Sequence, residues 1–277
     1  MKYALVTGAA KGIGQAIALE LAHLDYHLLL VDMDEDGLIH TSQLAKQQTG
    51  VGVHVMVQDL SENDAVNKIL DWYKSNFIGL EVLVNNAGFG LNGEFRHLSL
   101  DEQLDIVNVN IKAQLALTYL FIPILEKNQP GYILNVGSTT AYQTVPYCTV
   151  YSASKHFVLA FNRGLRHELR YNKNLSLTCV SPGSTDTDFV NRARMGDSVK
   201  ATAKKFNMTS SQVARIAIDA LFKKKAEVVT GWYNQVGAFL PRFFPEKFIC
   251  WVVGRIYEKT ITENHGTRSR IENRQEV

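Results

Sequence analysis

The sequence lacks an excess of charge of either sign. Its 29 lysines and arginines nearly balance 27 aspartates and glutamates, so the formal net charge is only +2. Domains that bind nucleic acid usually carry a strongly basic patch, and this balance therefore argues against nucleic acid as a partner. Hydrophobic residues make up 46% of the 277 residues, so the chain can bury a large core without disulfides or metals.

Cysteine is also scarce. Cys148, Cys179 and Cys250 are odd in number, far apart and without a C-x-x-C pair. The eight histidines show none of the spacings typical of zinc sites. We therefore expect no bound metal and no disulfide framework, and we expect a reduced, cytoplasmic setting.

Long apolar runs are missing as well. The chain has no uninterrupted apolar run of roughly 18 residues, the length that indicates a membrane-spanning helix. After Met1 and Lys2 it enters "YALVTG" at once, which is typical of a strand rather than of a signal peptide. The sequence thus predicts neither a transmembrane segment nor a secretory leader.

Short apolar runs alternate with segments of helical period instead. The runs span residues 3–6, 27–31, 51–57, 80–85, 132–136, 175–180 and 226–231. Their apolar residues are consecutive, which is typical of parallel strands that are covered on both faces. The alternation predicts an α/β fold, a doubly wound parallel sheet of the Rossmann type with about seven strands.

No repeat, low-complexity tract or linker divides the chain. We expect a single dinucleotide-binding catalytic domain over residues 1–231, followed by a helical C-terminal appendix over residues 232–277. The appendix consists of an apolar helical segment and a polar tail. Within the domain, Ser61 is expected to cap the helix that follows the third strand.

A glycine-rich loop, "TGAAKGIG", follows the first strand and opens the first helix. Gly8, Gly12 and Gly14 allow a tight turn and let backbone amides approach a pyrophosphate, to which the helix N-terminus adds partial positive charge. The spacing differs from the dinucleotide fingerprint G-x-G-x-x-G. A glycine turn without a ligand therefore stays open as an alternative.

Asp32 ends the second strand. A carboxylate there can accept hydrogen bonds from an adenosine ribose and would repel a 2′-phosphate, which favours NAD(H). Lys11, within the glycine loop, would tolerate a phosphate, so NADP(H) stays possible. The alternative is that Asp32 only caps the next helix.

Four further polar residues complete the pattern. Asn110 lies in a helical segment, Ser138 ends the fifth strand, and "YSASK" places Tyr151 and Lys155 one helical turn apart. A tyrosine hydroxyl has a pKa of about 10, and a nearby ammonium group is expected to lower it. The alternatives are a helix cap for the asparagine, a turn serine, and a surface tyrosine–lysine pair.

Together with "QDL" (58–60), "NNAG" (85–88) and "PGSTDT" (182–187), these motifs resemble the short-chain dehydrogenase/reductase family over residues 1–231. The resemblance implies a catalytic tetrad of Asn110, Ser138, Tyr151 and Lys155. The cofactor contacts that it implies, with the glycine-loop neighbours added, are Gly8, Lys11, Gly12, Ile13, Gly14, Asp32, Asp59, Leu60, Asn85, Ala87, Gly88, Tyr151, Lys155, Pro182, Gly183 and Thr187.

The resemblance also implies a reaction. A hydride would pass between NAD(H) and a secondary alcohol or ketone, with Tyr151 as general acid/base, Ser138 on the substrate oxygen and Asn110 holding a water. Homodimers or homotetramers would form through helices at about 102–127 and 150–172. Two alternatives stay open: an NAD-binding sensor or scaffold without turnover, and an epimerase or dehydratase relative.

The appendix is rich in aromatic residues, and every residue from 248 to 253 is apolar. Such a helix must be covered by something. It can pack beside the active site, bury against another subunit or make peripheral contact with a membrane surface. We favour the first, in which Trp232, Phe239 and Phe243 would wall a pocket for a bulky, apolar substrate.

Overall fold

The computed structural model describes residues 1–186, 192–194 and 207–258. Its main sheet has seven strands, all parallel, in the spatial order β3-β2-β1-β4-β5-β6-β9. Their bounds are β1 (Tyr3–Thr7), β2 (His27–Asp32), β3 (Val53–Val57), β4 (Leu80–Asn85), β5 (Gly131–Val136), β6 (Leu175–Ser181) and β9 (Glu227–Val229). The predicted doubly wound parallel sheet is confirmed. A short parallel pair, β7 (Thr185–Asp186) and β8 (Met208–Thr209), lies beside it.

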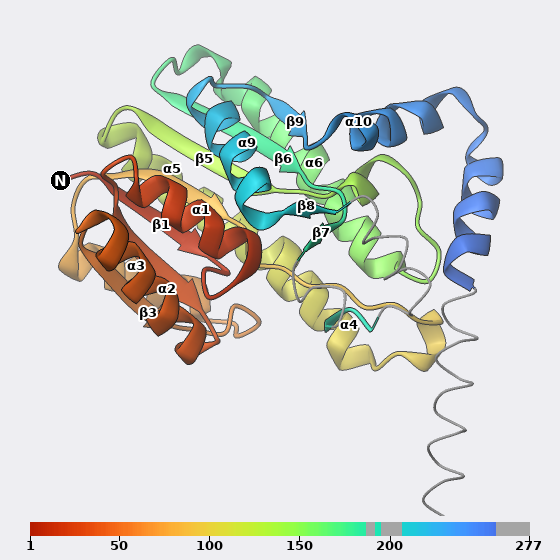
Figure 1. Ribbon diagram of the computed structural model, residues 1–277, viewed down its shortest axis with the longest axis horizontal. Coiled ribbons are helices and arrows are strands. Elements are labelled where there is room, and N and C mark those ends of the chain that lie inside the picture. Colours follow the sequence, from red (N-terminus) through yellow and green to blue (C-terminus); the bar gives the residue numbers. More distant parts are fainter. Residues whose placement is uncertain (187–191, 195–206, 259–277) are drawn as a thin grey trace, which may run out of the picture.

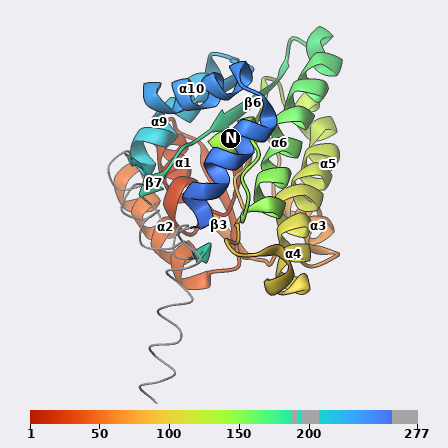
Figure 2. The same ribbon diagram turned by 90° about the vertical axis from the view of Figure 1, so that its right-hand side faces the viewer.

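Helices cover both faces of the sheet, with α1, α2 and α9 on one side and α3 to α6 on the other (Figure 2). The helices are α1 (Gly12–Ala22), α2 (Glu35–Thr49), α3 (Ala65–Asn76), α4 (Leu100–Val107), α5 (Gln114–Lys127), α6 (Thr149–Glu168), α9 (Ser210–Phe222) and α10 (Trp232–Phe239). Short helical turns are η1 (Phe95–His97), the π-helical η2 (Asn108–Ala113), η3 (Thr139–Tyr142), η4 (Leu169–Tyr171) and η5 (Leu240–Phe243).

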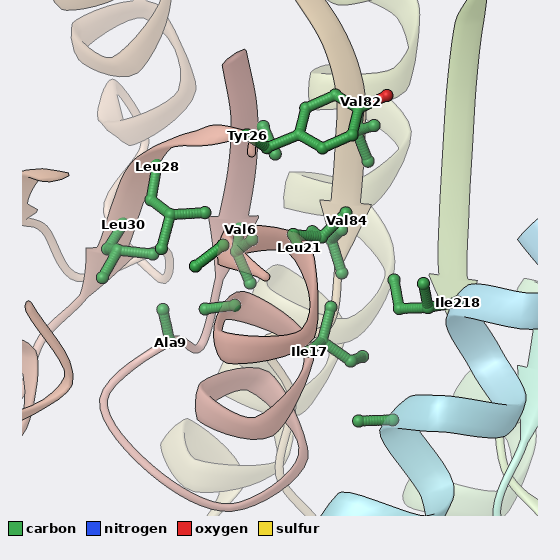
Figure 3. Close-up of a cluster of buried hydrophobic side chains, with 14 of the residues drawn as sticks. Val6, Ala9, Ile17, Leu21, Tyr26, Leu28, Leu30, Val82, Val84 and Ile218 are labelled. Carbon is green, nitrogen blue, oxygen red and sulfur yellow. The ribbon is translucent and has the colours of Figure 1, made fainter. Parts of the chain in front are cut away.

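Alternate residues of each central strand enter opposite cores. In β1, Val6 packs with Ile17 and Leu21 of α1, whereas Leu5 packs with Phe121 of α5. Figure 3 shows the first of these clusters, in which side chains from β1, β2 and β4 meet α1 and α9. Because both faces are buried, the strands are apolar at consecutive positions, as their sequences predicted.

The helix after β3 begins later than predicted. It starts at Ala65 with Asp64 before it, and Ser61 lies in the preceding turn. The Asp59 carboxylate accepts the amide of Ser61 at 2.8 Å. Ser61 is therefore part of an aspartate-stabilised turn, and its prediction as the helix cap was wrong.

One continuous helical run, residues 100–127, is long and apolar enough to cross a membrane by length and composition alone. In the fold it joins α4, η2 and α5, and its Leu117 and Phe121 are buried against the sheet. Core packing thus accounts for much of its apolar character.

The C-terminal segment leaves the sheet after β9. It runs along α10, turns through η5, and returns as a helix over residues 246–258, drawn in blue at the right of Figure 1. This returning helix, here called the C-terminal helix, packs Ile249 and Val253 on Val145 and Cys148 of the loop before α6. Residues 259–277 lie outside the described part of the chain.

Candidate active site

The carboxyl ends of the central strands border a cavity of about 590 Å³. Its walls come from the turns after β1, β2, β3, β4, β5 and β6, with α6 and the C-terminal helix closing one side. Parallel α/β sheets bind ligands at this edge, and the volume is within the range of small-molecule sites.

The glycine loop forms the floor beneath the N-terminus of α1. Gly8 and Gly12 have φ angles of 65° and 62°, which only glycine adopts without strain. A Cβ atom at Gly14 would stand 2.0 Å from the Gly8 carbonyl oxygen. Side chains at these positions would be strained or would clash with the loop itself, so the glycines keep it tight at the N-terminus of α1, as a pyrophosphate site requires.

Asp32 lines the cavity at the end of β2. Its two carboxylate oxygens accept the amides of Ala10 and Asp34, each at 3.1 Å. Asp34, not Asp32, caps α2 by accepting the Gly37 amide, so Asp32 is not the cap of that helix. Lys11 also lines the cavity and lies 3.8 Å from the Asp34 carboxylate.

Most of the remaining cofactor candidates meet in the same cavity. Those that line it are Ile13, Asp59, Leu60, Ala87, Gly88, Pro182 and Gly183. Thr187 lies outside the described residues. Asn86, Phe89 and Arg192 line the cavity too, although they were not predicted.

Asn85 is the exception, because it does not line the cavity. Its side chain is buried and donates to Thr118 of α5 at 3.0 Å and to Asn135 of β5 at 2.9 Å. Neighbouring residues at the end of a strand point to opposite faces, so Asn86 reaches the site and Asn85 does not. The prediction that Asn85 contacts the cofactor disagrees with this placement.

Tyr151, Ser138 and Lys155 lie together on the cavity wall. A side-chain hydrogen bond joins Tyr151 to Ser138. The Lys155 ammonium donates to the Val136 carbonyl at 2.9 Å and lies 5.8 Å from the centre of the Tyr151 ring. Both side chains are buried, so they do not form the surface pair that the spacing alone would allow.

Burial governs the ionisation of both groups. Burial raises the pKa of Tyr151 to about 12, although the Ser138 hydrogen bond opposes the shift. Burial also lowers the pKa of Lys155 to about 8. Desolvation disfavours the charged form of each group, and in this structure it outweighs the effect expected from the ammonium. The expectation that Lys155 lowers the pKa of Tyr151 was therefore wrong for the protein alone.

Asn110 lies behind this wall, in the π-helical turn, and is fully buried. Its amide donates to the Phe89 carbonyl at 2.9 Å and to the Ser154 hydroxyl at 3.0 Å, and its oxygen accepts the Phe89 amide at 3.1 Å. The side chain caps no helix and does not line the cavity. It fixes the loop after β4 against α6, which makes it a positioning residue in this structure.

The C-terminal helix closes the cavity with Ile256 and Tyr257. Glu246 accepts a hydrogen bond from Thr144 at 3.0 Å, which holds the start of the helix against the domain. This helix therefore packs beside the site, as favoured from the sequence.

The particular aromatic residues predicted for the wall were wrong. Trp232, Phe239 and Phe243 are 75%, 56% and 68% exposed and do not line the cavity. These residues belong to α10 and η5, which precede the C-terminal helix, and only that helix reaches the cavity. The signal that was missed is the spacing of Ile249, Val253 and Tyr257, which places them on one helical face.

A family model for short chain dehydrogenases matches residues 2–198. The chain belongs to this family. This short-chain dehydrogenase is 30% identical over 238 residues to the putative oxidoreductase SadH of Mycobacterium tuberculosis, across 83% of this chain and 86% of that protein. Its predicted family is thereby confirmed.

Solved structures show the same fold. A short-chain dehydrogenase from Sphingobium yanoikuyae in complex with NADPH has a TM-score of 0.77 at 22% identity, covering 88% of this chain and 91% of that one. A short-chain dehydrogenase/reductase from Burkholderia phymatum in complex with NAD has a TM-score of 0.78 at 24% identity, covering 87% and 93%. A nicotinamide dinucleotide fits this dehydrogenase, since the glycine loop, Asp32 and Lys155 line one continuous cavity of about 590 Å³.

Replacing Gly14 with alanine tests the cradle. The new Cβ atom must displace the Gly8 carbonyl, so we expect NADH and NADPH binding to weaken by roughly tenfold or more, the loss of one or more backbone hydrogen bonds. Fluorescence titration measures both affinities. Gly164→Ala is the matched control, because a Cβ atom there meets nothing within 4 Å. Equal affinities for the two variants would contradict the cradle.

Proposed function

We propose that this short-chain dehydrogenase transfers a hydride between NAD(H) and a secondary alcohol or ketone, with Tyr151 as the acid/base group. The observation that carries the proposal is the buried Tyr151 hydroxyl on the cavity wall, joined to Ser138, with the Lys155 ammonium close to its ring. Burying a lysine is costly unless the site uses it. Such a cluster has no evident purpose in a sensor or scaffold without turnover.

The ionisation states suit ketone reduction. With a pKa of about 12, Tyr151 keeps its proton at neutral pH and can donate it to a ketone oxygen. Ser138 would hydrogen-bond the same oxygen and hold it beside the phenol. The bound nicotinamide supplies the hydride chemistry, while the protein orients the substrate and supplies the proton. Lys155 would hold the cofactor ribose, and Asn110 would keep the loop after β4 in place.

Part of the cavity wall is apolar, with the Arg192 guanidinium 4.9 Å from the Phe89 ring. Phe89, Ile256 and Tyr257 line this part, and we propose a bulky, apolar alcohol or ketone as the substrate. Apolar walls with few polar groups are typical of sites that select by shape.

Tyr151→Phe tests the acid/base role. The variant keeps the ring but loses the proton, so we expect turnover to fall about 10²–10⁴-fold. NADH affinity should be unchanged, because the glycine loop, Asp32 and Lys155 remain. Steady-state reduction of a ketone panel and NADH titration measure the two effects. Tyr171→Phe, at an exposed tyrosine away from the cavity, is the control, and near-normal turnover of a folded Tyr151→Phe protein would refute the mechanism.

We further propose that NAD(H) is preferred over NADP(H). Asp32 supports this, because its carboxylate lies on the cavity wall where a 2′-phosphate would meet a like charge. Lys11 is drawn toward Asp34, 3.8 Å away, which reduces its availability to a phosphate.

Asp32→Ala should erase that preference. Removing a like charge at close range is expected to raise kcat/KM for NADPH roughly tenfold or more relative to NADH. The measurement is the ratio of kcat/KM for the two cofactors in wild type and variant. Asp36→Ala, an exposed acid in the first turn of α2, is the matched control. A wild-type preference for NADPH would overturn the assignment.

We also propose a cytoplasmic homodimer or homotetramer. Leu104, Val107, Leu115 and Tyr119 form a stripe on α4 and α5 that is 38–75% exposed. A symmetric contact would cover such a stripe. The absence of a disulfide among the three cysteines supports the location.

Light scattering tests the assembly. The wild type should give the mass of a dimer or tetramer at micromolar concentration, and Leu115→Glu should lower it, because a buried unpaired charge opposes association. Ile78→Glu, at an 85% exposed position outside the stripe, should leave the mass unchanged. A monomeric wild type would contradict this proposal.

A further inference from the structure

The C-terminal segment exposes a row of large apolar side chains. Its members, here called the aromatic face, are Phe239, Phe243, Phe244, Phe248 and Trp251, each 45–68% exposed. Their rings form two groups, with centroids 5.1 Å apart for Phe239 and Phe243, 5.7 Å for Phe244 and Phe248, and 6.3 Å for Phe248 and Trp251. Large exposed apolar surfaces of this kind mark interaction sites.

Phe248 and Trp251 of the aromatic face lie on the outer side of the C-terminal helix, whose inner side is already occupied. Val253 and Ile249 pack on the domain, Gly254 lies against Pro146, and the Glu246 carboxylate accepts from Thr144. The helix is therefore held with its outer side away from the domain. The domain itself cannot cover the aromatic face.

Charge is distributed unequally around this helix. The guanidinium groups of Arg242 and Arg255 lie 5.8 Å and 5.9 Å from the rings of Phe239 and Trp251, whereas the exposed Glu246 carboxylate is hydrogen-bonded to Thr144. Lys247 is exposed as well. The exposed acids of this helix, Glu246 and Glu258, lie at its two ends. The arginines are thus the charges placed against the rings, a combination that favours an anionic lipid surface.

We propose that the aromatic face docks on the surface of an anionic lipid bilayer. The phenylalanine and tryptophan rings enter the boundary between headgroups and acyl chains, and the arginines contact the headgroups. Ile256 and Tyr257 of the same helix line the cavity. Docking therefore brings the cavity next to the membrane surface. This inference concerns binding alone and does not depend on the proposed reaction.

Vesicle flotation of the full chain tests the docking. The protein should float with vesicles of equimolar phosphatidylcholine and phosphatidylglycerol, and bind phosphatidylcholine vesicles more weakly. Added salt should weaken binding to the anionic vesicles, because it screens the arginines. Arg242→Glu with Arg255→Glu should remove the preference for the anionic vesicles.

The double variant Phe248→Glu and Trp251→Glu should lose at least roughly tenfold in vesicle affinity, since two apolar side chains no longer enter the bilayer. Neither residue lines the cavity, so thermal unfolding and NADH binding should match the wild type. Tyr171→Glu is the control, because Tyr171 is 80% exposed and precedes β6 at the opposite edge of the sheet.

Three results would overturn the proposal. The first is a folded wild type that does not float with either vesicle, and the second is a double variant that floats as well as the wild type. The third is a wild type that does not bind vesicles together with a double variant whose oligomer dissociates in light scattering, which would assign the aromatic face to a second copy. Flotation uses neither cofactor nor substrate, so its outcome does not depend on whether the proposed reaction occurs.

Discussion

A chain of buried amide hydrogen bonds ties the helix α6 to strands β4 and β5 of the sheet. Asn85 of β4 donates to Asn135 of β5, which donates to Asn162 of α6 at 3.1 Å, and Asn162 in turn donates to the Ala226 carbonyl before β9. In a dry interior, an amide that loses its partner costs about 1–3 kcal/mol. The network therefore permits one position of α6 on the sheet, and the same helix carries Tyr151.

Once α6 is fixed, burial determines the chemistry of its two ionisable groups. In water, a tyrosine and a lysine lose their protons at nearly the same pH. On this cavity wall, their pKa values separate to about 12 for Tyr151 and about 8 for Lys155. Both shifts favour the uncharged form of the group, because a low dielectric disfavours charge. The phenol thus becomes the group that retains its proton, while the amine titrates near neutrality.

Sequence patterns within single elements were enough to predict the strands of the sheet and the glycine turns. Consecutive apolar residues identified all seven strands, and the left-handed turns at Gly8 and Gly12 required glycine. Predictions failed where a residue's direction depends on distant packing. Asn85, predicted to contact the cofactor, belongs to the core because of its parity on β4. The pKa of Tyr151 follows from its burial, which no local pattern reveals. The all-apolar stretch at 248–253 concealed which side of that helix faces inward.

The cavity wall supplied by Ile256 and Tyr257 comes from a part of the chain beyond residues 2–198, the part that the family model matches. Under the proposed function, the acid/base group and one part of the wall that would limit the shape of the substrate are thus encoded in separate stretches. Substitutions at Ile256 would then alter what fits while leaving the residues of the glycine loop in place. Such a division lets selectivity diverge between descendants of one enzyme while the reaction itself is inherited unchanged.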